Sequence, residues 1–185
     1  MFKIASWNVN SLKVRLPQVL DWLEDSQTDV LALQETKLED SAFPQEAFQE
    51  AGYEVIFRGQ KTYNGVAWIS RHPMTDVSDS FVDFPDEQKR ILAVTVNDTR
   101  LINFYIPNGQ SIDSPKYEYK LNWLNAMNNF IHQELQKYPK LVVVGDFNIA
   151  PDDIDVYDPK QWFGQVLVSD PERMAFSKLI RQGLT

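Results

Sequence analysis

The sequence predicts an α/β protein in which helices and buried strands form layers around a mixed sheet. Two short continuous apolar runs, Val30–Leu33 and Leu141–Val144, are typical of strands that are buried on both faces. Helices alternate with such strands early in the chain, and antiparallel pairs fill its middle.

The first part of the chain begins with a strand at Phe2–Trp7, and a helix with Pro17 in its first turn follows. The apolar residues of this helix recur at helical spacing: Leu16, Val19, Leu20 and Leu23. After the strand Val30–Leu33, we expect a short helix at Gln45–Glu50 and a strand at Tyr53–Phe57.

The middle of the chain predicts three further strands, at Val66–Ile69, Ile91–Val96 and Leu101–Ile106. The polar residues from Asn97 to Arg100 join the last two strands into a hairpin.

The last part predicts a long helix that begins at Ser114-Pro115, with Ser as the cap and Pro at the first helical position. Its apolar face contains Tyr117, Leu121, Leu124, Ile131, Leu135 and Tyr138. Leu141–Val144 is the most strongly buried strand candidate, with Gly145-Asp146 as its turn, and Arg173–Arg181 predicts a final helix. One sheet made from all these strands would have one apolar face that no later strand or helix covers.

The composition is that of a globular protein. The 185 residues are enough for one domain with a sizeable core, and 43% hydrophobic and 24% charged residues are ordinary values. There is no cysteine, which excludes disulfides and thiolate-bound zinc. The N-terminus lacks a signal-peptide pattern, and no apolar run approaches the ~20 residues of a membrane span. We therefore expect a cytoplasmic protein that makes no contact with a membrane.

The net charge is −8, from 18 basic and 26 acidic residues. This balance argues mildly against non-specific attraction to nucleic acid, because DNA-binding proteins usually carry a basic surface. It does not exclude DNA as a partner, because a metal-dependent enzyme concentrates carboxylates at its site.

Four segments that lie far apart in the sequence each end an apolar run in polar residues: Ser6–Asn10, Leu33–Glu35, Tyr105–Asn108 and Gly145–Asn148. A buried strand that stops in this way delivers a polar group to a sheet edge, so four such ends can converge on one site. Together they supply carboxylates, carboxamides and a phenol. Oxygen ligands of this kind suit Mg²⁺ and chemistry on a phosphate.

Each of these residues also has a purely structural interpretation. Glu35 could cap the next turn or pair with Lys37, and Tyr105 could be an ordinary strand aromatic. Asp146 and Asn148 are common turn residues. However, a carboxylate at the end of a buried strand is costly unless it is paired or lies near a cation.

Two other groups leave the same choice open. Asn8 and Asn10 could face one side of a strand end, or they could form a loop with Asx turns. Lys61, Tyr63 and Asn64 could contact a phosphate and stack on a base or sugar, or they could belong to a solvent-exposed hairpin.

The strand-end motifs resemble those of the endonuclease/exonuclease/phosphatase superfamily. Three of them occur in its order: Ile4–Leu12, Leu33–Lys37 and Val144–Asn148. The segment Tyr105–Gly109 resembles the nucleic-acid-directed branch. Two more segments are similar to the exodeoxyribonuclease III family: Lys61–Ala67, and Asp155–Pro159 with Trp162. The resemblance runs from Phe2 to Thr185, and six motifs in the right order are a specific signal.

The resemblance implies a four-layer α/β/β/α sandwich with mixed sheets, in one nuclease domain over residues 1–185. It implies hydrolysis of DNA phosphodiesters with Mg²⁺ or Mn²⁺. The implied metal ligands are Glu35, Asn8 and Asn10, and the implied catalytic residues are Tyr105, Asp146 and Asn148. The implied contacts to the substrate are Asn108, Lys61, Tyr63, Asn64 and Trp162.

The implied substrate is double-stranded DNA with abasic sites or 3′ ends, attacked by a monomer during base-excision repair. The sequence does not separate abasic-site incision from 3′–5′ exonuclease activity. One alternative is an incomplete fold that only binds DNA or a partner and exposes a large apolar face. Another is a superfamily phosphatase that acts on a small phosphate ester, although the segments Lys61–Ala67 and Asp155–Trp162 argue against it.

The sequence departs from the family pattern near its end. Family members continue through further strands to a Ser-Asp-His motif whose histidine completes the site. Neither His72 nor His132 stands in a matching context. We therefore expect these residues to form the N-terminal two-thirds of the family fold, with its second half incomplete.

Overall fold

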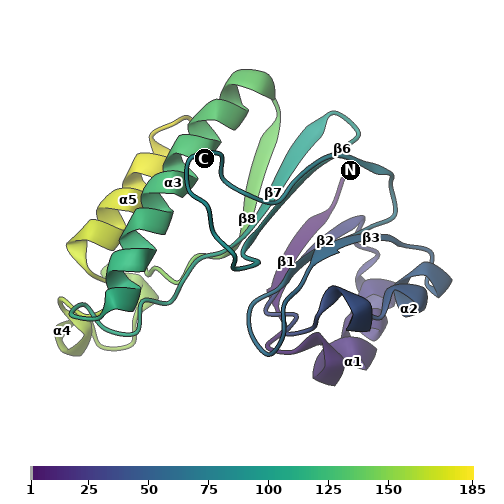
Figure 1. Ribbon diagram of the computed structural model, residues 1–185, viewed down its shortest axis with the longest axis horizontal. Coiled ribbons are helices and arrows are strands. Elements are labelled where there is room, and N and C mark those ends of the chain that lie inside the picture. Colours follow the sequence, from purple (N-terminus) through teal and green to yellow (C-terminus); the bar gives the residue numbers. More distant parts are fainter. Residues whose placement is uncertain (1) are drawn as a thin grey trace. The chain divides into compact units, whose positions relative to one another are not determined.

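The computed structural model describes residues 2–185, which divide into two compact units (Figure 1). The first unit extends to Ser80 and also contains Asp86–Tyr105 and Tyr138–Asp146. The second unit is built from Phe81–Pro85, Ile106–Lys137 and Phe147–Thr185.

The first sheet of the first unit has four strands in the order β1-β2-β4-β3. The strands are β1 (Ile4–Asn8), β2 (Val30–Gln34), β3 (Glu54–Arg58) and β4 (Val66–Ser70). β1 and β2 are parallel, and β4 is antiparallel to both β2 and β3. β2 is buried along its whole length, which confirms its prediction as a strand covered on both faces.

The second sheet of the first unit has the order β5-β6-β7-β8. Its strands are β5 (Met74–Ser78), β6 (Ile91–Val96), β7 (Thr99–Tyr105) and β8 (Leu141–Asp146). The predicted hairpin is confirmed, because β6 and β7 are antiparallel, whereas β7 and β8 are parallel. The sequence analysis missed β5, whose register shifts between Thr75 and Ser78 and whose Asp76 has a left-handed backbone (φ 49°).

The eight strands thus form two mixed sheets, which confirms the α/β fold with mixed sheets that the family resemblance implies. The two sheets cover each other through a shared core of buried residues: Val30, Ala32, Val66, Trp68, Leu92, Val94, Val96 and Leu101. The indole Nε1 of Trp68 donates a hydrogen bond to the carbonyl oxygen of Leu92 over 2.9 Å. The apolar faces that the sequence left without a cover are therefore the interior of this first unit.

A small polar network crosses the same interior just before the strand ends. Asn103 of β7 is fully buried, and its Nδ2 donates to the carbonyl oxygens of Leu33 (2.9 Å) and Ala67 (3.1 Å). Its Oδ1 accepts a hydrogen bond of 2.8 Å from Nε2 of Gln34. Because every polar atom of this network must find its partner inside the core, it fixes the register of one sheet against the other.

Helices α1 (Leu12–Ser26) and α2 (Gln45–Glu50) lie on the other side of the first sheet (Figure 1). Their core with that sheet contains Val9, Leu12, Val19, Leu23, Leu31, Leu33, Phe48, Tyr53, Ala67 and Ile69. A short 3₁₀ helix covers Asp40–Ala42. The expectation that Pro17 lies in the first turn of α1 is wrong, because α1 begins at Leu12 and Pro17 falls inside it.

The prediction for Leu141–Val144 also needs a correction. Every residue of β8 is only partly buried, so β8 is not the most buried strand. The reason is its place in the sheet, since β8 is an edge strand with one neighbour, β7. The strand also continues through Gly145 and Asp146, where the sequence predicted a turn.

The second unit is mainly helical. It contains α3 (Pro115–Lys137), the short α4 (Pro159–Trp162), α5 (Asp170–Ile180) and a 3₁₀ helix at Asp153–Asp155. α3 and α5 pack side by side (Figure 1). Ser114 caps α3 as predicted, because its Oγ accepts the N–H of Tyr117 over 3.2 Å. α5 begins earlier than predicted because Ser169 and Glu172 form a capping box before its first turn.

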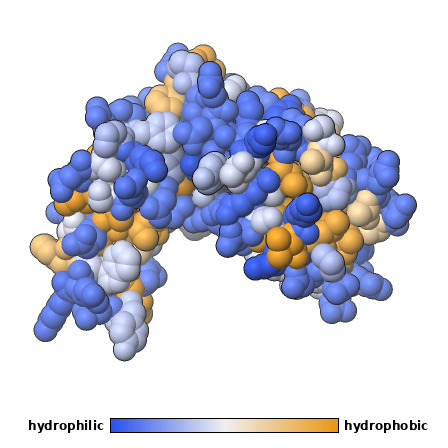
Figure 2. All heavy atoms as spheres, turned by 60° about the horizontal axis from the view of Figure 1, so that its bottom comes forward, coloured by the Kyte–Doolittle hydropathy of each residue, from blue (hydrophilic) through white to orange (hydrophobic). Residues whose placement is uncertain are grey.

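The surface seen in Figure 2 is mostly hydrophilic, and hydrophobic side chains interrupt it in separate patches. Tyr157, Ile154 and Phe163 are among the most exposed large hydrophobic residues. None of the helices in residues 2–185 combines the length and the apolar character that crossing a membrane requires.

Candidate active site at the strand ends

Four strand ends of the first unit bring the predicted polar residues together. β1 ends at Asn8, and Glu35 directly follows the last residue of β2, its parallel neighbour. In the second sheet, Tyr105 and Asp146 are the last residues of β7 and β8 and are paired in register. The carboxyl ends of parallel neighbours lie at the same end of a sheet. Each sheet therefore presents two of these residues side by side at the ends of its parallel pair.

Asn8 connects the two sheets at these strand ends. Its Nδ2 donates to Oε1 of Glu35 over 2.9 Å and to Oδ2 of Asp146 over 2.7 Å. Its Oδ1 accepts the backbone N–H of Asn10 over 3.0 Å. The neutral carboxamide thus lies between two carboxylates that would otherwise repel each other.

Glu35 also binds a cation of the protein itself. Nζ of Lys37 lies 2.9 Å from Oε2 of Glu35 and donates to Oδ1 of Asn10 over 2.5 Å. The pairing of Glu35 with Lys37, one of the structural interpretations above, is therefore present. Burial acts to raise the pKa of Glu35, but hydrogen bonds from Asn8, Lys37 and Tyr105 outweigh it and lower that pKa below its usual value.

The backbone at this position is unusual. Glu35 has φ 54° and Lys37 has φ 55°, both in the left-handed region that few residues other than glycine adopt. Neighbouring segments hold this conformation, since the carbonyl oxygen of Glu35 accepts the N–H of Ser11 over 2.8 Å. Strained conformations of this kind cluster at functional sites, where the surrounding structure over-determines them.

Tyr105 is a neutral phenol under physiological conditions. Burial, together with its hydrogen bond to the Glu35 carboxylate, raises the pKa of Tyr105 to about 12. The guanidinium of Arg90 lies 4.6 Å from the centre of the Tyr105 ring, and Nε of Arg90 donates to Gln88 over 2.8 Å. The phenol can therefore donate a hydrogen bond, but it is not a base near neutral pH.

Gly145 allows β8 to come close to β7. Its φ is 139°, and a Cβ atom at this position would lie 1.9 Å from the backbone oxygen of Phe104. Only glycine avoids this clash, because the obstacle is backbone and cannot rotate away. The missing side chain therefore sets the position of the next residue, Asp146, beside Tyr105.

The second unit holds the two remaining carboxamides of the predicted set. Nδ2 of Asn108 donates to Oδ1 of Asn148 over 3.1 Å, and Nδ2 of Asn148 donates to the carbonyl oxygen of Ile106 over 3.0 Å. Asn108 is exposed, and Asn148 has a left-handed backbone with φ 48°. Along the chain they follow Tyr105 and Asp146 by three and two residues.

The predicted DNA-contacting residues outside the strand ends differ in their surroundings. Tyr63 is 67% exposed and Lys61 is exposed beside it. Asn64 is buried, and its Nδ2 binds Gln60 (3.0 Å) and Gln88 (3.1 Å), so its side chain anchors the loop. Trp162 lies in α4 of the second unit and is 36% exposed.

Sequence reasoning missed three charged residues around these groups. Arg90 over the Tyr105 ring precedes β6 directly, where its cation–π contact leaves no local pattern. Lys120 and Glu172 are both fully buried in the second unit. The signals that could have found them were a lysine beside the apolar residues predicted for α3 and the Ser-x-x-Glu capping pattern Ser169–Glu172.

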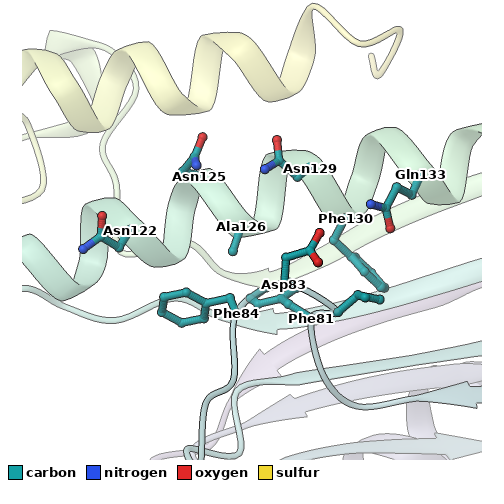
Figure 3. A pocket seen from close by; sticks show the side chains of 10 residues that line it. Phe81, Asp83, Phe84, Asn122, Asn125, Ala126, Asn129, Phe130 and Gln133 are labelled. Carbon is teal, nitrogen blue, oxygen red and sulfur yellow. The ribbon is translucent and has the colours of Figure 1, made fainter.

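A cavity of about 200 Å³ also opens in the second unit (Figure 3). Carboxamides of α3 line one part of it, and residues 81–84 line the other. None of the residues that the sequence analysis proposed for the site contributes to its lining.

The residues present fit a hard divalent cation. Among residues 2–185, no three His, Cys, Asp or Glu side chains gather closely enough to hold a metal ion by themselves. However, the Lys37 ammonium already rests on one oxygen of Glu35 and one of Asn10, which shows that this pair accepts a positive charge. A carboxylate, carboxamide oxygens and water are the ligands that Mg²⁺ uses.

Residues 5–171 match the model of the Endonuclease/Exonuclease/phosphatase family. The chain belongs to this family, and the family's α/β fold with two mixed sheets accounts for its strand order. Within the family it is a member of the exonuclease III/AP endonuclease group, as the relatives below show.

Exodeoxyribonuclease III of Haemophilus influenzae is 31% identical over 98% of this chain and 73% of that protein. The solved structure of the 3′ phosphatase NExo from Neisseria, bound to a product DNA hairpin, is 46% identical with a TM-score of 0.98. An AP endonuclease from Archaeoglobus fulgidus is 38% identical with a TM-score of 0.95. This chain covers 72% and 71% of those two structures, so part of each relative has no counterpart among these residues.

Proposed function

We propose that this protein hydrolyses phosphate esters of DNA during repair, with Mg²⁺ or Mn²⁺, by incision at abasic sites and removal of nucleotides from 3′ ends. The observation that carries the proposal is the cluster in which Asn8 joins Glu35 and Asp146 beside Tyr105. Membership of the exonuclease III/AP endonuclease group supports DNA as the substrate.

Glu35 is the proposed principal ligand of the metal, with Asn8 and Asn10 as carboxamide ligands. When bound, the metal supplies positive charge for the phosphate and for the charge that develops during hydrolysis. The oxygens of Glu35 and Asn10 that Lys37 contacts here would be the ones to hold the metal, and Lys37 would then have to move away from them. The low pKa of Glu35 keeps this carboxylate ionised and available at neutral pH.

Asp146 is the proposed group that orients a water molecule and accepts its proton as the water attacks phosphorus. The bond from phosphorus to the leaving oxygen breaks, that oxygen takes up a proton from solvent water, and Asp146 returns its proton to the solvent. When a phosphate is bound, Tyr105 donates its single phenolic hydrogen to a phosphate oxygen in place of Glu35, because its raised pKa keeps it protonated. Asn108 and Asn148 of the second unit each offer carboxamide hydrogens to phosphate oxygens.

Lys61, Tyr63 and Trp162 are proposed contacts to the DNA, and Asn64 supports the loop that carries the first two. Their chemistry suits a phosphate and the face of a base or sugar. We propose that the whole chain acts as one nuclease domain, as a monomer and in the cytoplasm.

A second candidate activity is the removal of a 3′ phosphate from DNA. It is favoured by one relative, the 3′ phosphatase NExo, which is 46% identical over 99% of this chain. The same groups would serve it, because a terminal phosphate differs from an internal one only in lacking its second ester bond.

The test is a substrate panel of DNA duplexes with one abasic site, a recessed 3′ hydroxyl or a 3′ phosphate, each assayed with Mg²⁺, with Mn²⁺ and with chelator. We expect metal-dependent cleavage, and a loss of about 100-fold or more in Glu35→Gln, which keeps the size of the side chain. The exposed Glu39→Gln is the matched control and should retain activity. A folded wild-type chain that cleaves none of these duplexes contradicts the proposal.

A further inference from the structure

A buried ion pair in the second unit has no part in the mechanism above. Nζ of Lys120 and Oε1 of Glu172 form a salt bridge, and both side chains have 0% exposure. Burial of two charges is expensive, and an apolar pair of similar size often gives equal or greater stability. Stability alone therefore does not explain this buried pair, and its contacts indicate what else it does.

Lys120 uses its remaining hydrogens on the two proposed phosphate-binding residues. Its ammonium donates to the backbone oxygen of Asn148 over 2.6 Å and to that of Asn108 over 3.1 Å. An ammonium group has three hydrogens, and these two carbonyls and Glu172 can each accept one of them. The same residues are linked again through their side chains, Asn108 to Asn148 over 3.1 Å.

Glu172 connects Lys120 of α3 with the beginning of α5. Its Oε1 also accepts the N–H of Leu167 over 3.0 Å, and its Oε2 accepts the N–H of Ser169 over 3.1 Å and the hydroxyl of Ser169 over 2.5 Å. The hydroxyl of Tyr117 on α3 lies 2.6 Å from that of Ser169. The carboxylate thus caps α5 and holds a lysine of α3 at the same time.

We propose that the Lys120–Glu172 pair is a clamp that positions Asn108 and Asn148 for contact with the phosphate of bound DNA. The inference rests on the proposed function. Asn108 is an exposed residue of a loop in which Gly109 and Gln110 have left-handed backbones (φ 96° and 63°) and no regular structure sets its direction. The ammonium holds the backbone oxygens of both residues, and the side chain of Asn108 donates to that of Asn148, so the two carboxamides are fixed beside each other. Lys120 and Glu172 are therefore positioning residues, not catalytic ones.

The clamp differs from a merely stabilising ion pair in one measurable respect. If it only stabilised the second unit, loss of its charge would lower the melting temperature, and activity below that temperature would not change. If it positions the carboxamides, turnover falls in protein that is still folded, because small displacements of groups that contact the transition state cost about 10- to 100-fold in rate.

The test compares Glu172→Gln with Glu134→Gln. Gln keeps the size of Glu172 and its accepting oxygen, and it removes the charge that holds Lys120. Glu134 is also a buried carboxylate of this unit, 4% exposed, and it forms a salt bridge with the exposed Lys137 of the same helix. Lys120→Met serves as a second variant. Each is measured for melting temperature, for kcat and KM on duplex DNA, and by NMR of the side-chain amides of Asn108 and Asn148.

We expect Glu172→Gln and Lys120→Met to shift both amide signals, and we expect Glu172→Gln to lower kcat about 10-fold or more with little change in KM. Glu134→Gln should change the melting temperature alone. Wild-type kcat and unshifted signals in folded Glu172→Gln overturn the clamp while leaving the proposed function intact.

A separate NMR titration keeps the two proposals distinguishable. Duplex DNA is added in the presence of Ca²⁺, and the side-chain amides of Asn108 and Asn148 are followed in wild type and in Glu172→Gln. A shift on DNA binding in wild type that is weakened in Glu172→Gln supports the clamp even if no substrate is cleaved. The absence of any shift in wild type overturns it.

Discussion

At the scale of single residues, the site depends on neutral hydrogen-bond donors placed between charges. Asn8 donates to both Glu35 and Asp146, so two carboxylates share one edge of the fold without direct contact. Tyr105 is a second donor, because its hydrogen bond to Glu35 keeps the phenol protonated. The polar end of each strand predicted these residues, whereas Arg90 was not predictable because it contacts Tyr105 only after the chain has folded.

The phenol of Tyr105 predicts a pH dependence of stability. In the unfolded chain a tyrosine has a pKa of about 10, whereas burial and Glu35 raise the pKa of Tyr105 to about 12 in the folded protein. The unfolded state therefore loses this proton first. The stability that the protonated Tyr105 side chain contributes to the folded protein is complete below pH 10. It is lost as the pH rises from about 10 to 12.

Urea unfolding at a series of pH values from about 9 to 11 measures this effect. Wild type should lose stability more steeply with pH than Tyr105→Phe, which has no proton to lose. Equal slopes for the two proteins contradict the prediction.

At the scale of elements, the sequence pattern predicted most strands and the β6–β7 hairpin, but not the other strand pairings. Apolar runs identify β2, β4 and β6 well, because a strand buried on both faces needs such a run. The same rule fails for β8, which has an apolar sequence and yet lies at a sheet edge, and for β5, whose sequence is mixed. The division into two sheets depends on long-range pairing that no local pattern reports.

The buried network of Asn103 predicts a large effect of one substitution. Asn103→Leu removes the partner of Gln34 and of two backbone oxygens within the core. We expect the free energy of unfolding to fall by about 3 kcal/mol, because buried polar groups without a partner cost about 1–3 kcal/mol each. Urea denaturation at pH 7 is the measurement.

Thr95→Val is a suitable comparison. Thr95 is buried in the adjacent strand β6, and its hydroxyl is one of the few buried side-chain groups in residues 2–185 without a hydrogen-bond partner. Its replacement should leave stability unchanged or raise it. A loss of similar size in both variants would show that the packing, and not the network, determines the effect of Asn103→Leu.

At the scale of the whole molecule, the chain alternates between its two units. It passes from one to the other after Ser80, Pro85, Tyr105, Lys137 and Asp146. Neither unit is a continuous segment, so neither can be cut out of the chain as a separate piece. One nuclease domain over residues 1–185 stays a prediction, and the sequence offers no boundary from which the two units themselves could be foreseen.

We therefore predict that both units unfold in a single transition. Scanning calorimetry should show one peak whose calorimetric and van't Hoff enthalpies agree, as for a two-state domain. Two resolved peaks, or an enthalpy ratio well above one, would show that the units are independent folding domains.

Gly145 has a consequence for how this sequence can vary. The carbonyl oxygen of Phe104 lies where any other residue would carry its Cβ. A random codon at this position, followed by selection for DNA cleavage, should return glycine codons alone, even though the residue touches no substrate. A position without a catalytic group can thus be as invariant as a catalytic acid, because any side chain there would clash with the backbone.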